Sequence, residues 1–83
     1  MKQIQKLKIE FYQWESAEML SYFCSEAKFV SPTKDFNPYS GCVVQSPRSK
    51  CEILANIQAQ FGNTLPLIKG NVYEFKREIT EVA

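Results

Sequence analysis

The feature that most restricts the fold of this chain is a bounded helix pattern in its second half. Ser46-Pro47 joins an N-cap residue to a proline suited to the first helical turn, and Ser49–Glu52 fits the capping box S-x-x-E. Apolar residues then recur at spacings of three and four, at Leu54, Ile57 and Phe61. Gly62, followed by asparagine, fits a left-handed C-cap. We therefore predict a helix from about residue 47 to residue 61.

A second amphipathic pattern, earlier in the chain, also indicates a helix. Ser16 is a good N-cap, and Glu18 in the first turn would complement the helix dipole. Five apolar residues then recur at helical spacing: Met19, Leu20, Phe23, Cys24 and Ala27. We predict a helix from about Ala17 to Lys28, followed by a short strand at Phe29-Val30.

The N-terminal segment has the period of a half-buried strand. Apolar residues alternate there with polar ones, at Leu7, Ile9 and Phe11. Tyr12 and Trp14 fall on the opposite parity from these three. Either the polar face of the strand carries two exposed rings, or a bulge near Phe11 switches the facing.

Three further segments indicate strands and a turn. Gly41–Val44 shows little polar alternation, as a central strand would. Thr64–Lys69 is apolar but interrupted by Pro66, which suits an edge strand or an extended connector. Gly70-Asn71 indicates a tight turn, and the alternating tail from Val72 onward indicates a long half-buried strand.

Together these patterns give the order βαββαβ, the ferredoxin-like arrangement. We predict an α+β fold, a two-layer sandwich in which an antiparallel sheet carries two helices on one face. A chain of 83 residues is the size of one domain, so residues 1–83 are expected to form a single small α+β domain. The second strand of this order rests on Phe29 and Val30 alone.

Composition removes several kinds of chemistry. The chain contains no histidine, the commonest general base and zinc ligand. The three cysteines match no zinc or redox spacing; we expect Cys24 and Cys51 to pack in the core and Cys42 to be buried. A single aspartate and isolated glycines give no divalent-cation cluster and no phosphate-binding loop. We therefore expect no enzyme activity, no cofactor and no metal site.

The sequence also bears on compartment. The N-terminus lacks the features of a secretory signal, and no apolar stretch approaches the roughly 18 residues needed to cross a bilayer. An odd number of cysteines without such a signal favours a reducing compartment. We expect a soluble, cytoplasmic protein with no membrane contact.

The leading hypothesis for function is a non-enzymatic protein-binding module, such as an adaptor, an inhibitor or a regulatory subunit. It would act through an open sheet face or an edge strand, on another protein or on a second copy in a homodimer. The candidate partner-binding residues are four aromatics: Tyr12, Trp14, Phe36 and Tyr39. For the last two, which lie on a loop, the alternative is that their rings tuck beneath it as a satellite cluster.

The alternative function is a single-stranded nucleic-acid (RNA) binding module. Tyr12 and Trp14 would stack on bases, and Lys6 and Lys8 on the same parity would contact phosphates. The aromatic signature of RNA-recognition motifs is missing, however, and Glu10 on that face would repel a phosphate backbone. The net charge of +1 also lacks the basic excess of a duplex-DNA binder. A thiol-dependent enzyme is the third hypothesis, and it lacks a histidine to activate the thiol.

Overall fold

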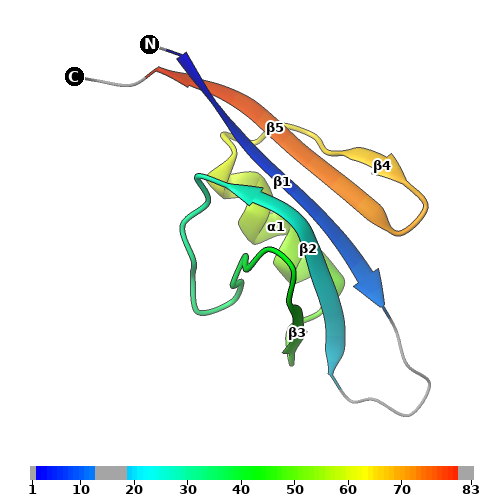
Figure 1. Ribbon diagram of the computed structural model, residues 1–83. Helices are drawn as coiled ribbons and strands as arrows, with labels where there is room; N and C mark the ends of the chain where they lie inside the picture. Colours follow the sequence, from blue (N-terminus) through cyan, green and yellow to red (C-terminus); the bar gives the residue numbers. More distant parts are fainter. Residues whose placement is uncertain (1, 13–18, 81–83) are drawn as a thin grey trace.

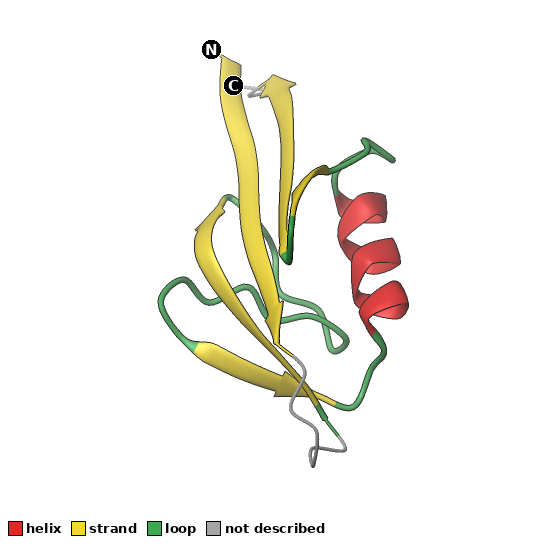
Figure 2. Ribbon diagram, turned by 90° about the vertical axis from the view of Figure 1, so that its right-hand side faces the viewer, coloured by secondary structure: helices red, strands yellow, loops and turns green. Residues whose placement is uncertain are grey.

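The computed structural model describes residues 2–12 and 19–80. In that part of the chain, five strands form one antiparallel sheet, and a single helix lies against one of its faces (Figures 1 and 2). The elements in chain order are β1 (Lys2–Tyr12), β2 (Leu20–Lys28), β3 (Val43–Ser46), α1 (Lys50–Gln60), β4 (Leu67–Lys69) and β5 (Val72–Thr80). The strand order across the sheet is β3-β2-β1-β5-β4, which places β1 at the centre.

The segment expected to form the first helix is strand β2, so the prediction of a ferredoxin-like βαββαβ fold with two helices is wrong. The fold of the described residues is mostly β, with one short helix. In the pairing of β1 with β2, Lys8 lies opposite Glu26. The next residue of β1, Ile9, lies opposite Cys24. Ser25 is therefore an extra residue in β2, which makes it a β-bulge.

This bulge accounts for the last step of the helix-like periodicity in this strand, from Cys24 to Ala27. Side chains alternate between the faces of a strand, so Tyr22 and Cys24 both point toward the core, where both are buried. The extra residue delays the next core-facing position by one, to Ala27, which lies opposite the buried Leu7. The spacing of three between Cys24 and Ala27 imitates one face of a helix.

The short strand predicted at Phe29-Val30 is also absent. Phe29 has a φ of 59°, and this left-handed residue ends β2 and turns the chain into the loop before β3. β3 occupies an edge of the sheet instead of the central place predicted for Gly41–Val44. Its first residue, Val43, is consequently 65% exposed.

The predicted second-half helix is confirmed, but it begins three residues later than the first start signal. The Ser49 side chain is the N-cap and accepts a hydrogen bond from the Glu52 backbone N–H at 3.2 Å. Ser46 and Pro47 precede the helix, and the Ser46 hydroxyl accepts from the Arg48 backbone N–H instead. At the other end, Gly62 has the expected positive φ of 66°. α1 has 11 residues, and none of the helices in the described ranges is long and apolar enough to span a membrane.

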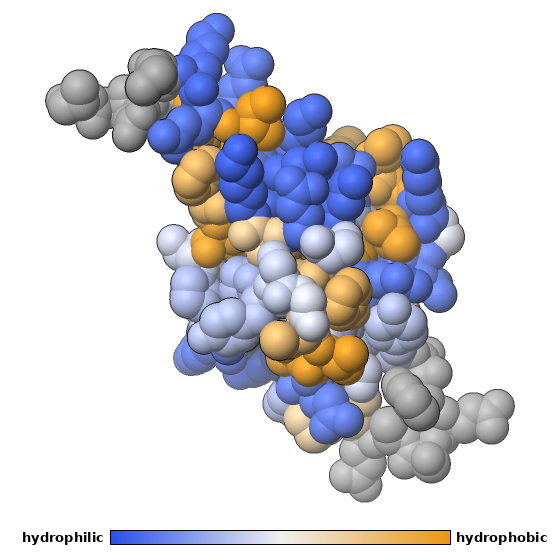
Figure 3. Space-filling view, in the orientation of Figure 1, coloured by the Kyte–Doolittle hydropathy of each residue, from blue (hydrophilic) through white to orange (hydrophobic). Residues whose placement is uncertain are grey.

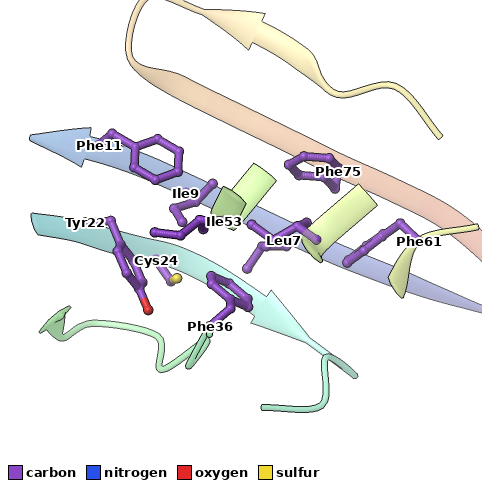
Figure 4. Packing of buried hydrophobic residues seen from close by; sticks show 10 residues of the cluster. Leu7, Ile9, Phe11, Tyr22, Cys24, Phe36, Ile53, Phe61 and Phe75 are labelled. Atoms are coloured by element: carbon purple, nitrogen blue, oxygen red, sulfur yellow. The ribbon is translucent and has the colours of Figure 1, made fainter. Parts of the chain in front are cut away.

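The core lies between α1 and the sheet, and Figure 4 shows its side chains meeting there. Ten apolar residues are buried: Leu7, Ile9, Phe11, Tyr22, Cys24, Phe36, Ile53, Ile57, Phe61 and Phe75. The alternation predicted for β1 is confirmed by the burial of its three apolar residues. The predicted tight turn at Gly70-Asn71 and the long strand after it are confirmed as the β4–β5 hairpin.

Candidate functional site

The candidate site is the face of the sheet opposite α1, which we call the open face. Residues directly paired on neighbouring strands have side chains on the same face. The strand pairings therefore place one row of five residues across the open face, which we call the central row: Val43, Phe23, Glu10, Val72 and Lys69. Three of the five are apolar, and Glu10 lies in their midst. The row combines an aromatic ring, aliphatic side chains and a carboxylate.

Toward the N-terminal end of β1, the open face is charged and largely neutralised. Lys6 forms ion pairs with Glu26 at 3.3 Å and with Glu74 at 3.7 Å. Lys2 lies 3.9 Å from Glu78. Figure 3, in the orientation of Figure 1, shows mostly hydrophilic surface in the upper half of this view and hydrophobic surface in its lower middle and at the sides. Lys2 and Glu78 are well exposed, and such pairs contribute little to stability. The Lys6 side chain is only 24% exposed between its two glutamates, so its charge is matched within the chain and this part of the face is distinct from the central row.

Of the four predicted partner-binding residues, Tyr12 lies beside the central row. It is half-buried and lies opposite Ser21. A hydrogen bond to Glu10 raises the pKa of Tyr12 above its ordinary value. Up to Tyr12, the last described residue of β1, the facing does not switch near Phe11, since the register irregularity lies between Lys8 and Ile9 in the pairing with β2. Trp14 lies outside the described residues.

The two loop aromatics, Phe36 and Tyr39, differ in how far they are buried. Phe36 is 1% exposed, and its ring stacks on Tyr22 with centroids 5.7 Å apart. It therefore tucks beneath the loop, which was the alternative for this residue. Tyr39 is 56% exposed and remains available for contact.

Two hollows beside the sheet are lined by described residues. The first, of about 320 Å³, lies between β3 and the turn that carries Asp35 and Asn37. The Tyr22 hydroxyl accepts a hydrogen bond from the Asn37 backbone N–H there, at 3.2 Å. Asp35 Oδ1 lies 2.9 Å from Arg48 Nε at its rim. Its lining is half polar and half apolar, and the described contacts join Asp35 to Arg48 and to no hydroxyl group of the lining.

The second hollow, of about 300 Å³, lies at the end of β1, between Tyr12, Leu20 and Lys50. The ammonium group of Lys50 lies 4.7 Å from the centroid of the Tyr73 ring and 5.8 Å from that of Phe11. These cation–π contacts hold the lysine against the aromatic wall. The hollow extends the aromatic surface of Tyr12 around the end of the sheet.

The burial of the three thiols differs from the prediction for two of them. Cys24 is buried as expected, and burial raises its pKa to about 11, so it is protonated and unreactive near neutral pH. Cys42 and Cys51 are exposed, so the prediction that both are buried is wrong. Cys51 follows the first residue of α1 and lies off its buried face. Within the residues described, no three potential ligands from cysteine, aspartate and glutamate cluster as a metal site would require.

The buried thiol predicts a loss of stability at alkaline pH. The unfolded chain releases the Cys24 proton near its ordinary pKa of 9.0, whereas the folded chain retains it to about pH 11. The stability that depends on the protonated Cys24 thiol is fully present below pH 9. Between pH 9 and the folded pKa of about 11, the free energy of unfolding should fall by about 1.4 kcal/mol per pH unit. Denaturant titrations across this window measure the slope. The Cys24→Ala variant should have a shallower slope, and an equal slope in both proteins would contradict this origin.

Sequence reasoning missed two surface features. Phe23 was assigned to a helix stripe, so its place in the central row was not expected. The second feature is a group of exposed aliphatic residues around β4, which we call the β4 strip: Leu65, Leu67 and Ile68, exposed by 84%, 57% and 56%. The available signal was the apolar run at Thr64–Lys69, which Pro66 interrupts. It predicted an edge strand or an extended connector, but it did not indicate that the aliphatic side chains would be exposed.

Comparison with known proteins gives no significant match to a family model, a curated protein or a solved structure.

Proposed function

We propose that this protein is a non-enzymatic protein-binding module, an adaptor, inhibitor or regulatory subunit, that docks a partner protein on the open face. The observation that carries this proposal is the central row, in which Phe23, Val43 and Val72 lie on a sheet face that α1 does not cover. Aromatic and aliphatic side chains at the centre of a patch with a polar rim are typical of interface cores. Tyr12 and the ion-paired lysines supply such a rim.

The charge of the open face favours a protein over RNA as the partner. Lys6, which would contact phosphates, is already held by two glutamates. Glu10 lies inside the central row, where it would meet the backbone or bases of a bound strand. A basic groove that follows the backbone, typical of single-strand binding, is not formed by these residues. A protein partner with a donor for Glu10 and apolar side chains for its neighbours fits better.

The exposed thiols bear on compartment. We propose a reducing compartment, the cytoplasm, for this protein; the free and exposed thiols of Cys42 and Cys51 support this proposal. Exposed free thiols oxidise readily in secreted surroundings.

Truncating Phe23 tests the proposed interface. Phe23→Ala should weaken partner binding by about 2 kcal/mol or more, roughly thirtyfold, because a central aromatic is removed. The immobilised protein is incubated with native lysate, with and without nuclease, and the bound proteins are quantified. Phe29→Ala is the matched control, since Phe29 is an exposed ring at the end of β2, outside the central row.

Three outcomes separate the hypotheses. Proteins retained by the parent chain and by Phe29→Ala, lost with Phe23→Ala and insensitive to nuclease, would support the proposal. Equal retention by both variants would contradict it. Loss of the bound material after nuclease treatment would favour the RNA-binding alternative instead.

A further inference from the structure

We propose that two copies of this chain pair through strand β4, antiparallel to one another, about a twofold axis that passes at Ile68. The β4 strip lies at the edge of the sheet where the central row ends, at Lys69, and the outer side of β4 pairs with no described strand. Pairing two such edges would join both sheets into one.

The exposed aliphatics lie on both faces of the sheet, which indicates a strand as the occupant. Leu67 lies opposite Glu74 and so points to the open face. Ile68 lies opposite Tyr73 and points to the face that carries α1. A partner docked on one face would cover only one of these side chains. A strand added at the edge places side chains beside both.

The sequence of β4 selects the alignment of the second copy. In a twofold antiparallel pair, the residue at the axis lies opposite itself. An axis at Lys69 would oppose two lysines, which is unfavourable. An axis at Leu67 would set Pro66 opposite Ile68, inside the new ladder, where proline has no N–H to donate. An axis at Ile68 avoids both and pairs Leu67 with Lys69 of the second copy.

Charge and hydrophobicity both match in this alignment. On the open face, one cross-strand row then runs from Glu74 to Leu67 and on to Lys69 of the second copy. Two strand spacings, about 9.6 Å, separate the lysine and glutamate backbones, a distance that these long side chains can bridge over the leucine. On the other face, the row from Ile9 through Tyr73 to Ile68 continues into the same row of the second copy. A second copy of this chain therefore offers Glu74 a second cation beside Lys6, which already pairs with it, and continues the apolar row on the other face.

Only three residues of each copy pair, so the contact is small and the dimer should form in a concentration-dependent manner. A cysteine placed at the twofold axis should trap the dimer as a disulfide. Directly opposed residues on antiparallel strands have Cα atoms about 4.5 to 5.5 Å apart, within the range of a disulfide. In a Cys42→Ser, Cys51→Ser background, Ile68→Cys should give a covalent dimer on mild oxidation with copper–phenanthroline. Leu67→Cys, the matched control, should give much less covalent dimer. In this alignment position 67 lies opposite position 69 of the second copy, so the two introduced cysteines do not face each other.

Sedimentation equilibrium of the unmodified chain supplies the second test. Ile68→Lys should weaken self-association at least about tenfold, since it opposes two charges at the axis. Val43→Lys at the other edge of the sheet, and Phe23→Ala in the central row, should leave it unchanged. A monomer at every concentration, or equal cross-linking at positions 67 and 68, would overturn the proposal. Because Phe23→Ala tests the open face alone, failure of one proposal is distinguishable from failure of the other.

Discussion

Replacing Phe75 by alanine is expected to lower the free energy of unfolding by about 3 to 5 kcal/mol. Phe75 is 1% exposed, lies on β5 beside the central strand, and packs against the Phe61 ring with centroids 5.7 Å apart. Truncation removes the transfer free energy of the ring and leaves a cavity between the sheet and α1. A domain of this size has a total stability of only about 4 to 12 kcal/mol, so this one substitution should remove a large share of it.

Chemical denaturation followed by far-ultraviolet circular dichroism measures this loss. Phe29→Ala removes the same atoms from an exposed ring and should cost less than about 1 kcal/mol. Comparable destabilisation by the two substitutions would show that Phe75 is not a core residue.

The second large effect distinguishes two adjacent residues of α1. Ile53→Ala should destabilise the protein by about 2 to 4 kcal/mol, because Ile53 is fully buried. Leu54→Ala should cost roughly half of that or less, because Leu54 is only partly buried at the margin of the core. Both substitutions introduce alanine, the best helix former, so helix propensity does not explain a difference.

The midpoints and slopes of urea denaturation curves for the two variants, with Ile57→Ala as a positive control, give the comparison. If Leu54→Ala destabilised the protein more than Ile53→Ala, the buried face of α1 would be centred on Leu54, as the sequence spacing predicts.

Elements with local signals could be predicted from the sequence. The N-cap at Ser49, the glycine after α1 and the turn at Gly70 each depend on backbone chemistry within a few residues. The same is true of the alternation in β1 and β5, where one face of each strand meets the core. The sequence spacing located α1 and centred its apolar stripe on Leu54, Ile57 and Phe61, with Ile53 only widening it, because Ile53 and Leu54 both fit a helical period with Ile57.

The error at β2 has a nonlocal cause. The bulge at Ser25 exists because two strands pair around it, and its effect on the apolar spacing is visible only once that pairing is known. The misassignment then removed Phe23 from the candidate site, since a residue on a helix stripe cannot lie on a sheet face. Tyr12 was found because parity along a single strand is a local property, whereas the burial of Phe36 depends on Tyr22, which lies on another element.

The strand order has a consequence for how the chain folds. β1, the first strand, is central, and one of its two neighbours is β5, the last described strand, with Lys2 opposite Thr80 (Figure 1). Contacts so distant in sequence raise the contact order and slow folding. On the ribosome, β1 has only β2 as a neighbour until β5 has emerged, so one side of the future central strand stays open while β3, α1 and β4 are synthesised. The interval before β5 arrives is therefore when the nascent chain is most prone to pair with the wrong strand.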